Sequence, residues 1–299
     1  MTGVQIGARV IVKNILYLTD FSEPSEAALP FAASIAREYG AKVHAYHVMI
    51  PATYTYTTPE LTAAALEGQE DFAVTNMQRV GAYLGSLPHE TIVERGTGIW
   101  PSLEEAIKDY AIDLIVLGTH GRTGAQKLLM GSVAEEVFRR SHVPVLTIGP
   151  GERLGAHRGA RFRHVLYATD FTAESLAAAP YALSMAQENE ARLTLLHVMK
   201  EPEKRPYDKA MEDAISSAMF QLHEIVPQPA ESWCKPEAVV EFGNPADQIL
   251  RTAKERSADL IVLGVRGSRG VPGAATHLER ATAHKVVVHA QCPVLTVRG

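Results

Sequence analysis

The sequence contains one structural unit twice. The segment Leu16–Phe21 recurs as Leu166–Phe171, and Asp113–Gly118 (DLIVLG) recurs unchanged as Asp259–Gly264. Two shorter pairs follow in the same order: His47–Met49 with His197–Met199, and Pro144–Thr147 with Pro293–Thr296. Each pair is separated by close to 150 positions. Self-similarity at a nearly fixed spacing marks a repeated fold unit, so the chain is predicted to be a duplicated domain.

The repeat also sets the expected domain boundaries. The first copy should span residues 1–149 and the second residues 164–299. Residues 150–163 are rich in Gly and Arg and lack apolar periodicity, which is typical of a linker. Solvated linker charge is the favoured interpretation of their arginines, and an anion-binding patch is the alternative. Each copy is long enough to bury its own core.

Composition excludes several classes of protein. The net charge of −5 argues against a nucleic-acid partner, which would require a basic face. The two cysteines cannot form a disulfide framework and suit a reducing compartment. The apolar runs are strand-sized, and the N-terminus lacks the apolar segment of a signal peptide. We therefore expect a cytoplasmic protein with no membrane or nucleic-acid partner.

The first copy alternates between apolar runs and helical patterns. A parallel sheet with helices on both faces is predicted, because continuous Val/Ile/Leu strands are buried on both sides. The expected strands are Asn14–Thr19, Ala41–Val48, Thr91–Arg95, Asp113–Leu117 and Val143–Ile148. The expected helices run from Ser22 to Tyr39, Pro59 to Leu87, Leu103 to Tyr110 and Ser132 to Ser141. The fold class is α/β.

Ligands of open α/β sheets bind beyond the carboxyl ends of the strands. In the first copy those ends carry Thr19-Asp20, His47-Val48 and Gly118. Asp20 could accept hydrogen bonds from ribose hydroxyls, although a residue of the helix-entry turn is the alternative. His47 and His197 are interpreted as packing residues at the strand ends rather than as ligands.

The segment Gly118–Ser132 has the features of a phosphate-binding loop. Gly118 would allow a sharp turn off the strand, and Gly121 would let backbone approach a ligand. Gly131-Ser132 opens a helix, and Ser132 to Glu135 has the spacing of a capping box. Free N–H groups at a helix start bind anions, although a simple strand-to-helix connection is the alternative.

These residues together resemble the universal stress protein family. The pattern is Gly118-x2-Gly121-x9-Gly131-Ser132 combined with YxTDFSE at the first strand and a closing PVLT strand. The likeness covers both halves, so the chain resembles a tandem member. It implies two repeated Rossmann-like domains, each with an open five-stranded parallel sheet, and ATP at the strand ends, with or without Mg²⁺. Carried over by position, adenine and ribose would be held by Thr19, Asp20, Val48 and Leu117. The phosphates would be held by Gly118, Gly121, Gly131, Ser132 and Val133.

The second copy departs from this pattern. It keeps Asp170, Gly264 and Gly267, but Arg280-Ala281 stands where the first copy has Gly131-Ser132. A long side chain would occupy the phosphate space, so we expect one nucleotide per chain, bound by the first copy. Arg280 as a substitute phosphate ligand is the alternative.

Several catalytic motifs are absent from the sequence. No Gly-Lys-Ser/Thr loop, His-Glu-x-x-His or Cys-x-x-Cys occurs, so no dedicated metal site and no catalytic residue is predicted. The leading hypothesis is an ATP-binding regulator of the stress response whose loaded state is recognised by protein partners. A slow Mg²⁺-dependent ATPase, with Arg122 or Lys127 neutralising charge, and a nucleotide-free scaffold are the alternatives.

The last strand of each copy is expected at a sheet edge. Val143–Ile148 and Cys292–Val297 close their copies, and exposed edges invite pairing. Members of the resembled family commonly pair through this strand, which predicts an intramolecular pseudo-dimer of the two copies, with a homodimer as a further arrangement.

Overall fold

The computed structural model describes most of both copies. Its described residues are 10–50, 59–119, 130–149, 161–201, 209–228, 230, 234, 236–265 and 274–299, with the backbone alone described for 59–65 and 274–281. The chain divides into two compact units, one of residues 11–160 and one that contains residues 161–299. Within the described residues no helix has the combination of length and apolar character required to cross a membrane.

The first unit is an open five-stranded parallel sheet. Its strands lie in the order β3-β2-β1-β4-β5, and each neighbouring pair is parallel. The bounds are β1 (Asn14–Leu18), β2 (Lys42–Met49), β3 (His89–Arg95), β4 (Leu114–Gly118) and β5 (Val145–Ile148). Strand order reverses between β1 and β4, so the carboxyl ends of these two strands open a crevice.

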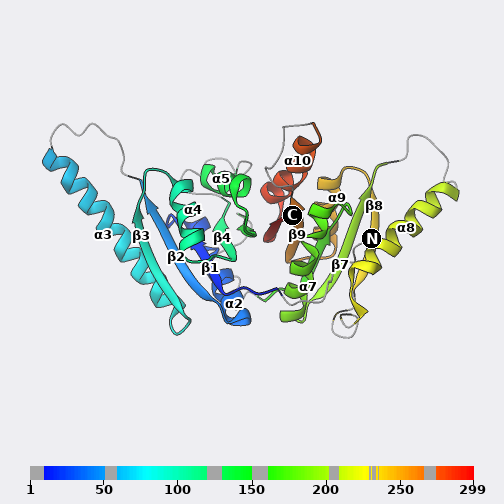
Figure 1. Ribbon diagram of the computed structural model, residues 1–299, viewed down its shortest axis with the longest axis horizontal. Coiled ribbons are helices and arrows are strands. Elements are labelled where there is room, and N and C mark those ends of the chain that lie inside the picture. Colours follow the sequence, from blue (N-terminus) through cyan, green and yellow to red (C-terminus); the bar gives the residue numbers. More distant parts are fainter. Residues whose placement is uncertain are drawn as a thin grey trace. The chain divides into compact units, whose positions relative to one another are not determined.

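Helices cover both faces of this sheet (Figure 1). Their bounds are α1 (Glu23–Glu26), α2 (Leu29–Tyr39), α3 (Pro59–Leu84), α4 (Ile99–Asp109) and α5 (Ser132–Arg140). Helix α2 packs on β1 and β2, α3 packs on β2 and β3, and α4 contacts α5. Right-handed crossovers place α2 and α3 on one face and α4 and α5 on the other.

The second unit repeats this arrangement. Its strands lie in the order β8-β7-β6-β9-β10 and are parallel. They are β6 (His164–Ala168), β7 (Arg192–Met199), β8 (Glu237–Phe242), β9 (Leu260–Val265) and β10 (Val294–Arg298). The helices are α6 (Ala173–Leu176), α7 (Ala179–Glu188), α8 (Lys209–Ile225), α9 (Pro245–Glu255) and α10 (Ala274–His289). Two repeated parallel α/β units confirm the predicted fold class.

The central strands form the core of each unit. Ile15, Leu16 and Tyr17 of β1 are fully buried, as are Val165 and Leu166 of β6. Burial on consecutive positions means that both faces of the sheet are covered, which is why these strands are continuous apolar runs.

Two expected helix boundaries were wrong. The single helix predicted from Ser22 to Tyr39 is two helices, because Pro30 has no N–H for the Glu26 carbonyl and its ring would clash there. Helix α4 begins at Ile99 rather than Leu103, after Gly98 in extended conformation at the N-cap. Trp100 in the first turn is buried together with Leu103, and Pro101 is tolerated there because the first turn needs no intrahelical bond from its N–H.

Candidate functional site

The turn between β1 and α1 is held by a compact hydrogen-bond network. Thr19 Oγ1 lies 3.0 Å from Ser25 Oγ and accepts a 3.0 Å hydrogen bond from the Phe21 N–H. The buried Tyr17 hydroxyl donates to the Ser25 carbonyl at 2.9 Å. These bonds tie the strand end to the first turn of α1, so the turn is fixed by the chain itself.

Asp20 lies at the edge of this turn and is partly exposed. Its Oδ1 accepts hydrogen bonds from the Ser22 N–H at 3.0 Å and the Ser22 hydroxyl at 2.5 Å. Ser22 is also the N-cap of α1, because its Oγ accepts from the Ser25 N–H at 3.4 Å. The Asp20 carboxylate is therefore held in one orientation at the carboxyl end of β1.

His47 supports the turn from β2. Its Nδ1 donates to the Thr19 carbonyl at 2.8 Å, and its ring centroid lies 4.4 Å from that of Phe21. Phe21 has φ of 61°, a left-handed conformation that is costly for a residue with a Cβ. The histidine thus stabilises a strained residue next to Asp20, in agreement with the packing role predicted for it.

Gly118 is required by packing. A Cβ built there would lie 2.4 Å from the Pro24 carbonyl oxygen and 3.0 Å from the Ser25 N. Its φ is not among the positive values of the described residues, so the predicted sharp turn is not the reason for this glycine. The backbone of α1 instead lies directly on the end of β4.

The start of α5 presents backbone N–H groups that no side chain caps. Gly131 is the N-cap, and the first intrahelical bond runs from the Glu135 N–H to the Gly131 carbonyl at 2.9 Å. The N–H groups of Ser132, Val133 and Ala134 therefore have no partner within the helix. The predicted capping box was wrong, since Ser132 is the first helical residue and cannot act as the N-cap.

Gly131 itself has φ of −61° and ψ of 148°, which any residue can adopt. Its N–H donates to the Thr119 carbonyl at 2.7 Å, which fixes the helix start beside the end of β4. Backbone conformation alone does not explain the glycine.

A cavity of about 240 Å³ lies at the carboxyl ends of the strands, between Asp20 and the start of α5. Eight of the nine residues predicted by sequence line it: Thr19, Asp20, Val48, Leu117, Gly118, Gly131, Ser132 and Val133. The ninth, Gly121, lies outside the described residues, as do Arg122 and Lys127. The structure thus brings together parts of the chain more than 100 residues apart in sequence.

Other lining residues were not predicted by sequence as ligand contacts. They include Ser25, His47, Ile99 and Thr119. Ile99 enters through the early start of α4, for which the Gly98 that precedes it was the available signal. Thr119 follows directly on β4, and its hydroxyl donates to the Ile148 carbonyl at 3.2 Å.

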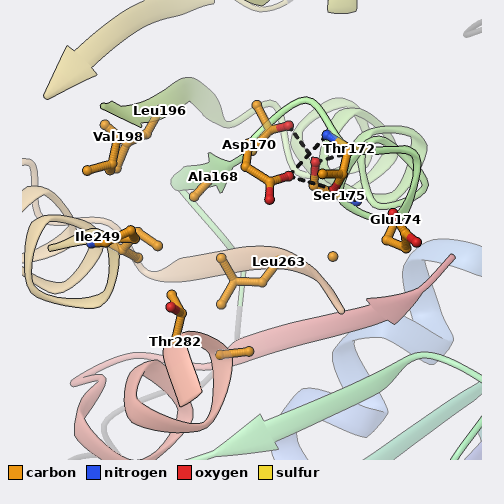
Figure 2. Close-up of a pocket in the computed structure, with 14 residues that line it drawn as sticks. Ala168, Asp170, Thr172, Glu174, Ser175, Leu196, Val198, Ile249, Leu263 and Thr282 are labelled. Atoms are coloured by element: carbon orange, nitrogen blue, oxygen red, sulfur yellow. Dashed lines mark hydrogen bonds between the residues drawn. The ribbon is translucent and has the colours of Figure 1, made fainter. Parts of the chain in front are cut away.

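The second unit has a cavity of about 270 Å³ in the equivalent place, and Figure 2 shows its lining. Its turn carries the same network: Thr169 Oγ1 lies 2.9 Å from Ser175 Oγ, and Asp170 Oδ1 accepts from the Thr172 N–H at 3.1 Å and hydroxyl at 2.6 Å. His197 donates to the Thr169 carbonyl at 2.9 Å and stacks on Phe171, whose φ is 63°.

The electrostatic state of this second turn follows from its hydrogen bonds. Partial burial acts to raise the pKa of the Asp170 carboxyl, but the hydrogen bonds from Thr172 and Ser175 outweigh it and hold that pKa below its ordinary value. Asp170 is therefore a carboxylate at neutral pH.

The two units differ at the helix that follows the fourth strand. Helix α10 begins at Ala274, about two turns before the position that corresponds to the start of α5. The residues of α10 that line the second cavity, Thr282 and Ala283, lie in the helix interior, where N–H groups are bonded within the helix. The side chains of Arg280 and Ala281 lie outside the described residues.

The described residues offer few side chains for metal binding or redox chemistry. There, no group of three or more His, Cys, Asp or Glu side chains is placed to hold a metal ion. Cys234 and Cys292 are buried free thiols, and burial raises the pKa of Cys234 to about 11. Such a thiol is a poor nucleophile at neutral pH.

Comparison with known proteins identifies the family. The model of the universal stress protein family matches the chain twice, over residues 12–149 and 161–298. The chain belongs to the universal stress protein family. Its two matched segments confirm the tandem organisation predicted from the internal repeat.

Individual relatives agree with this assignment. A universal stress protein of Methanocaldococcus jannaschii is 34% identical over 145 residues, covering 46% of this chain and 82% of that protein. A universal stress protein of Mycolicibacterium smegmatis is 27% identical over 294 residues, covering 95% of this chain and 97% of that protein. The crystal structure of a universal stress protein from Archaeoglobus fulgidus DSM 4304 has a TM-score of 0.67 at 23% identity, with 96% of both chains covered. That structural likeness shows the fold.

Proposed function

We propose that the first unit binds ATP in the cavity beside Asp20 and that the protein is a nucleotide-dependent regulator of the stress response. One observation carries the proposal. A fixed carboxylate and an uncapped helix start lie on the same 240 Å³ cavity at the carboxyl ends of the strands.

The carboxylate side suits a nucleoside. Asp20 can accept hydrogen bonds from the two ribose hydroxyls, since an ionised carboxylate offers acceptors on both oxygens. Val48 and Leu117 supply apolar surface for a heterocycle, and both are buried against the sheet. Binding would cost no conformational entropy at this turn, because the hydrogen bonds of the turn are already made within the chain.

The helix start suits phosphates. Three N–H groups without intrahelical partners, at Ser132, Val133 and Ala134, and the positive end of the α5 dipole favour an anion. The glycine at position 131 keeps this approach free of a side chain, and its backbone conformation gives no other reason for it.

The lining supports binding rather than rapid turnover. Of its described residues, Asp20 and His47 are the titratable ones, and both are engaged in the turn described above. In this proposal the Asp20 carboxylate is occupied by the ribose hydroxyls and His47 Nδ1 by the Thr19 carbonyl, so a regulator whose state depends on bound nucleotide is favoured over a fast enzyme.

Equilibrium dialysis of the full chain with labelled ATP tests this proposal. We expect one ATP per chain, with Asp20→Asn weakening it by about tenfold or more because charge-assisted hydrogen bonds are lost. The matched variant Asp170→Asn, at the equivalent place in the second unit, should leave ATP binding unchanged. Two equivalent ATP sites per chain, or no binding at all, would contradict the proposal.

A further inference from the structure

A third cavity lies in the second unit, at the end of the sheet opposite to Asp170. It is formed where the last turns of α9 and α10, which pack against each other, meet the amino ends of β9 and β10 (Figure 1). Leu250, Lys254, Ala258 and Cys292 are among its lining residues, and we call it the basal cavity. Its volume of about 490 Å³ is within the range of small-molecule sites, which is about 300–1,000 Å³.

Small side chains open the basal cavity. Ala253 and Ala258 line it, and the repeat aligns these two positions with Ile107 and Ile112 of the first unit. Both isoleucines are buried there. Alanine in place of a buried isoleucine leaves space that the surrounding chain closes only in part. The basal cavity is therefore a feature in which the second unit differs from the first.

The floor of the basal cavity is apolar. Ala253, Ile261, Ala290 and Cys292 line it and are buried, and the half-buried Leu250 adds to the apolar surface. Such a surface favours a hydrocarbon occupant, because binding removes apolar area from water. An apolar cavity of about 150 Å³ is enough to hold benzene, so this one has room for a larger hydrocarbon body.

The rim of the basal cavity is basic. Arg251, Lys254 and His289 line it and are exposed. The Arg251 guanidinium lies 2.7 Å from a carboxylate oxygen of Glu241 and 3.7 Å from one of Glu255, so its charge is already balanced. Lys254 makes no ion pair with any described residue. The rim thus offers one uncompensated positive charge beside an apolar floor.

The first unit shows what makes this lysine different. Lys108 stands at the corresponding position, and its ammonium group lies 3.6 Å from a carboxylate oxygen of Glu104. In the second unit Leu250 stands in place of Glu104, and Arg251 stands in place of Glu105. The lysine is present in both units, whereas the acids beside it are present only in the first. One unpaired cation suits a ligand with a single negative charge better than a multiply charged anion.

We propose that the basal cavity binds a small organic monocarboxylate, with its hydrocarbon body against Ala253 and Ala258 and its carboxylate at Lys254. Ser257 and Gln291 also line the cavity and offer hydroxyl and amide donors to the carboxylate. The site is independent of the proposed ATP site, because its lining belongs to the second unit and lies at the other end of the strands.

Isothermal titration calorimetry of the full chain with octanoate and 2-naphthoate tests the proposal, one probe with a flexible chain and one with a flat ring. We expect at least one of them to bind. The uncharged octanamide and 2-naphthamide have the same bodies, and the amide of the bound acid should bind about threefold to fivefold more weakly. This difference should shrink in 1 M NaCl, because the charge at the rim is exposed to solvent and is screened by salt (about 3 Å Debye length).

Two variants locate the binding. Ala258→Ile gives the cavity the side chain of the first unit, and it should weaken binding by about tenfold or more at unchanged or higher thermal stability, because it fills empty space. Lys254→Gln should weaken binding about threefold to fivefold. Lys108→Gln is its matched control in the first unit and should leave binding unchanged. Thermal melts show that each variant is folded, and the exposed position of Lys254 keeps the test valid if Ala258→Ile does not fold.

The proposal is overturned if neither carboxylate binds or if the amides bind as tightly as the acids. It is also overturned if folded Ala258→Ile or Lys254→Gln binds with wild-type affinity, or if ATP displaces the carboxylate. Failure of ATP to bind the first unit would leave all these outcomes unchanged, so the two proposals fail separately.

Discussion

The cavities beside Asp20 and Asp170 agree at the turn after the first strand and differ at the helix after the fourth. In the first unit, Thr19 and Ser25 are joined at 3.0 Å, and in the second, Thr169 and Ser175 are joined at 2.9 Å. In contrast, α5 begins at the cavity, whereas α10 passes it as continuous helix. Divergence has therefore changed one half of the cavity and left the other half intact.

The preserved half has a structural reason to persist. The buried hydroxyls of Tyr17 and Tyr167 each require an acceptor, and the carbonyls of Ser25 and Ser175 supply it. Loss of the turn would leave a buried phenol unsatisfied. No buried hydroxyl of this kind depends on where the helix after the fourth strand begins. The start of that helix can therefore change without leaving a polar group unsatisfied in the core. The presence of Asp170 is consequently weaker evidence for ligand binding in the second unit than the change at α10 is against phosphate binding there.

The largest expected effect is at the helix start. The variant Gly131→Arg places in the first unit the residue type that stands at the corresponding position of the second, Arg280. It should weaken ATP binding about a hundredfold, because two or more charge-assisted hydrogen bonds are lost. Isothermal titration calorimetry measures this change. Gly68→Arg is the matched control, since Gly68 is exposed on α3 with no atom within 4 Å of a built Cβ. Wild-type affinity in Gly131→Arg would show that α5 does not contact the phosphates.

The second expected effect is a loss of stability, equal in the two units, when the glycine that ends the fourth strand is replaced. Gly118→Ala and Gly264→Ala each place a Cβ within 2.4 Å and 2.2 Å of a backbone oxygen, so each should lower the free energy of unfolding by about 1–3 kcal/mol. Urea denaturation of each variant measures this. Gly68→Ala in the exposed part of α3 should be neutral or stabilising. If Gly118→Ala lost ATP affinity at unchanged stability, the glycine would serve the ligand and not the packing of α1.

The smallest expected effect concerns the N-caps of α1 and α6. Ser22→Ala and Thr172→Ala each remove a hydroxyl that caps the helix and bonds the neighbouring carboxylate, and each should cost about 1 kcal/mol of stability. Thermal melts followed by circular dichroism give the difference. Similar losses in the two units would support a shared structural role. A loss in one unit alone would show that the two caps differ in their contribution to stability.

The sequence was sufficient for the fold and for most of the cavity lining. Continuous apolar runs such as Asp113–Leu117 identified the parallel strands, and the repeat identified the two units. The start of α4 at Ile99 was missed although Trp100 continues the apolar spacing of Leu103 and Ala106, and Pro101 is compatible with a first helical turn. The packing role of Gly118 could not be inferred, since the contact with Pro24 joins residues that are distant in the chain. The early start of α10 was missed because the residues before Arg280 carry no apolar periodicity.

The turn after the first strand has a consequence for the rates of binding. Its hydrogen bonds and the stacking of His47 on Phe21 are complete without a ligand, so no segment of this half must be ordered during association. The same holds for His197 and Phe171 in the second unit. The turn should therefore not limit the rate at which ATP associates with the first unit, and the residence time of ATP should be set by what the opposite side of the cavity offers.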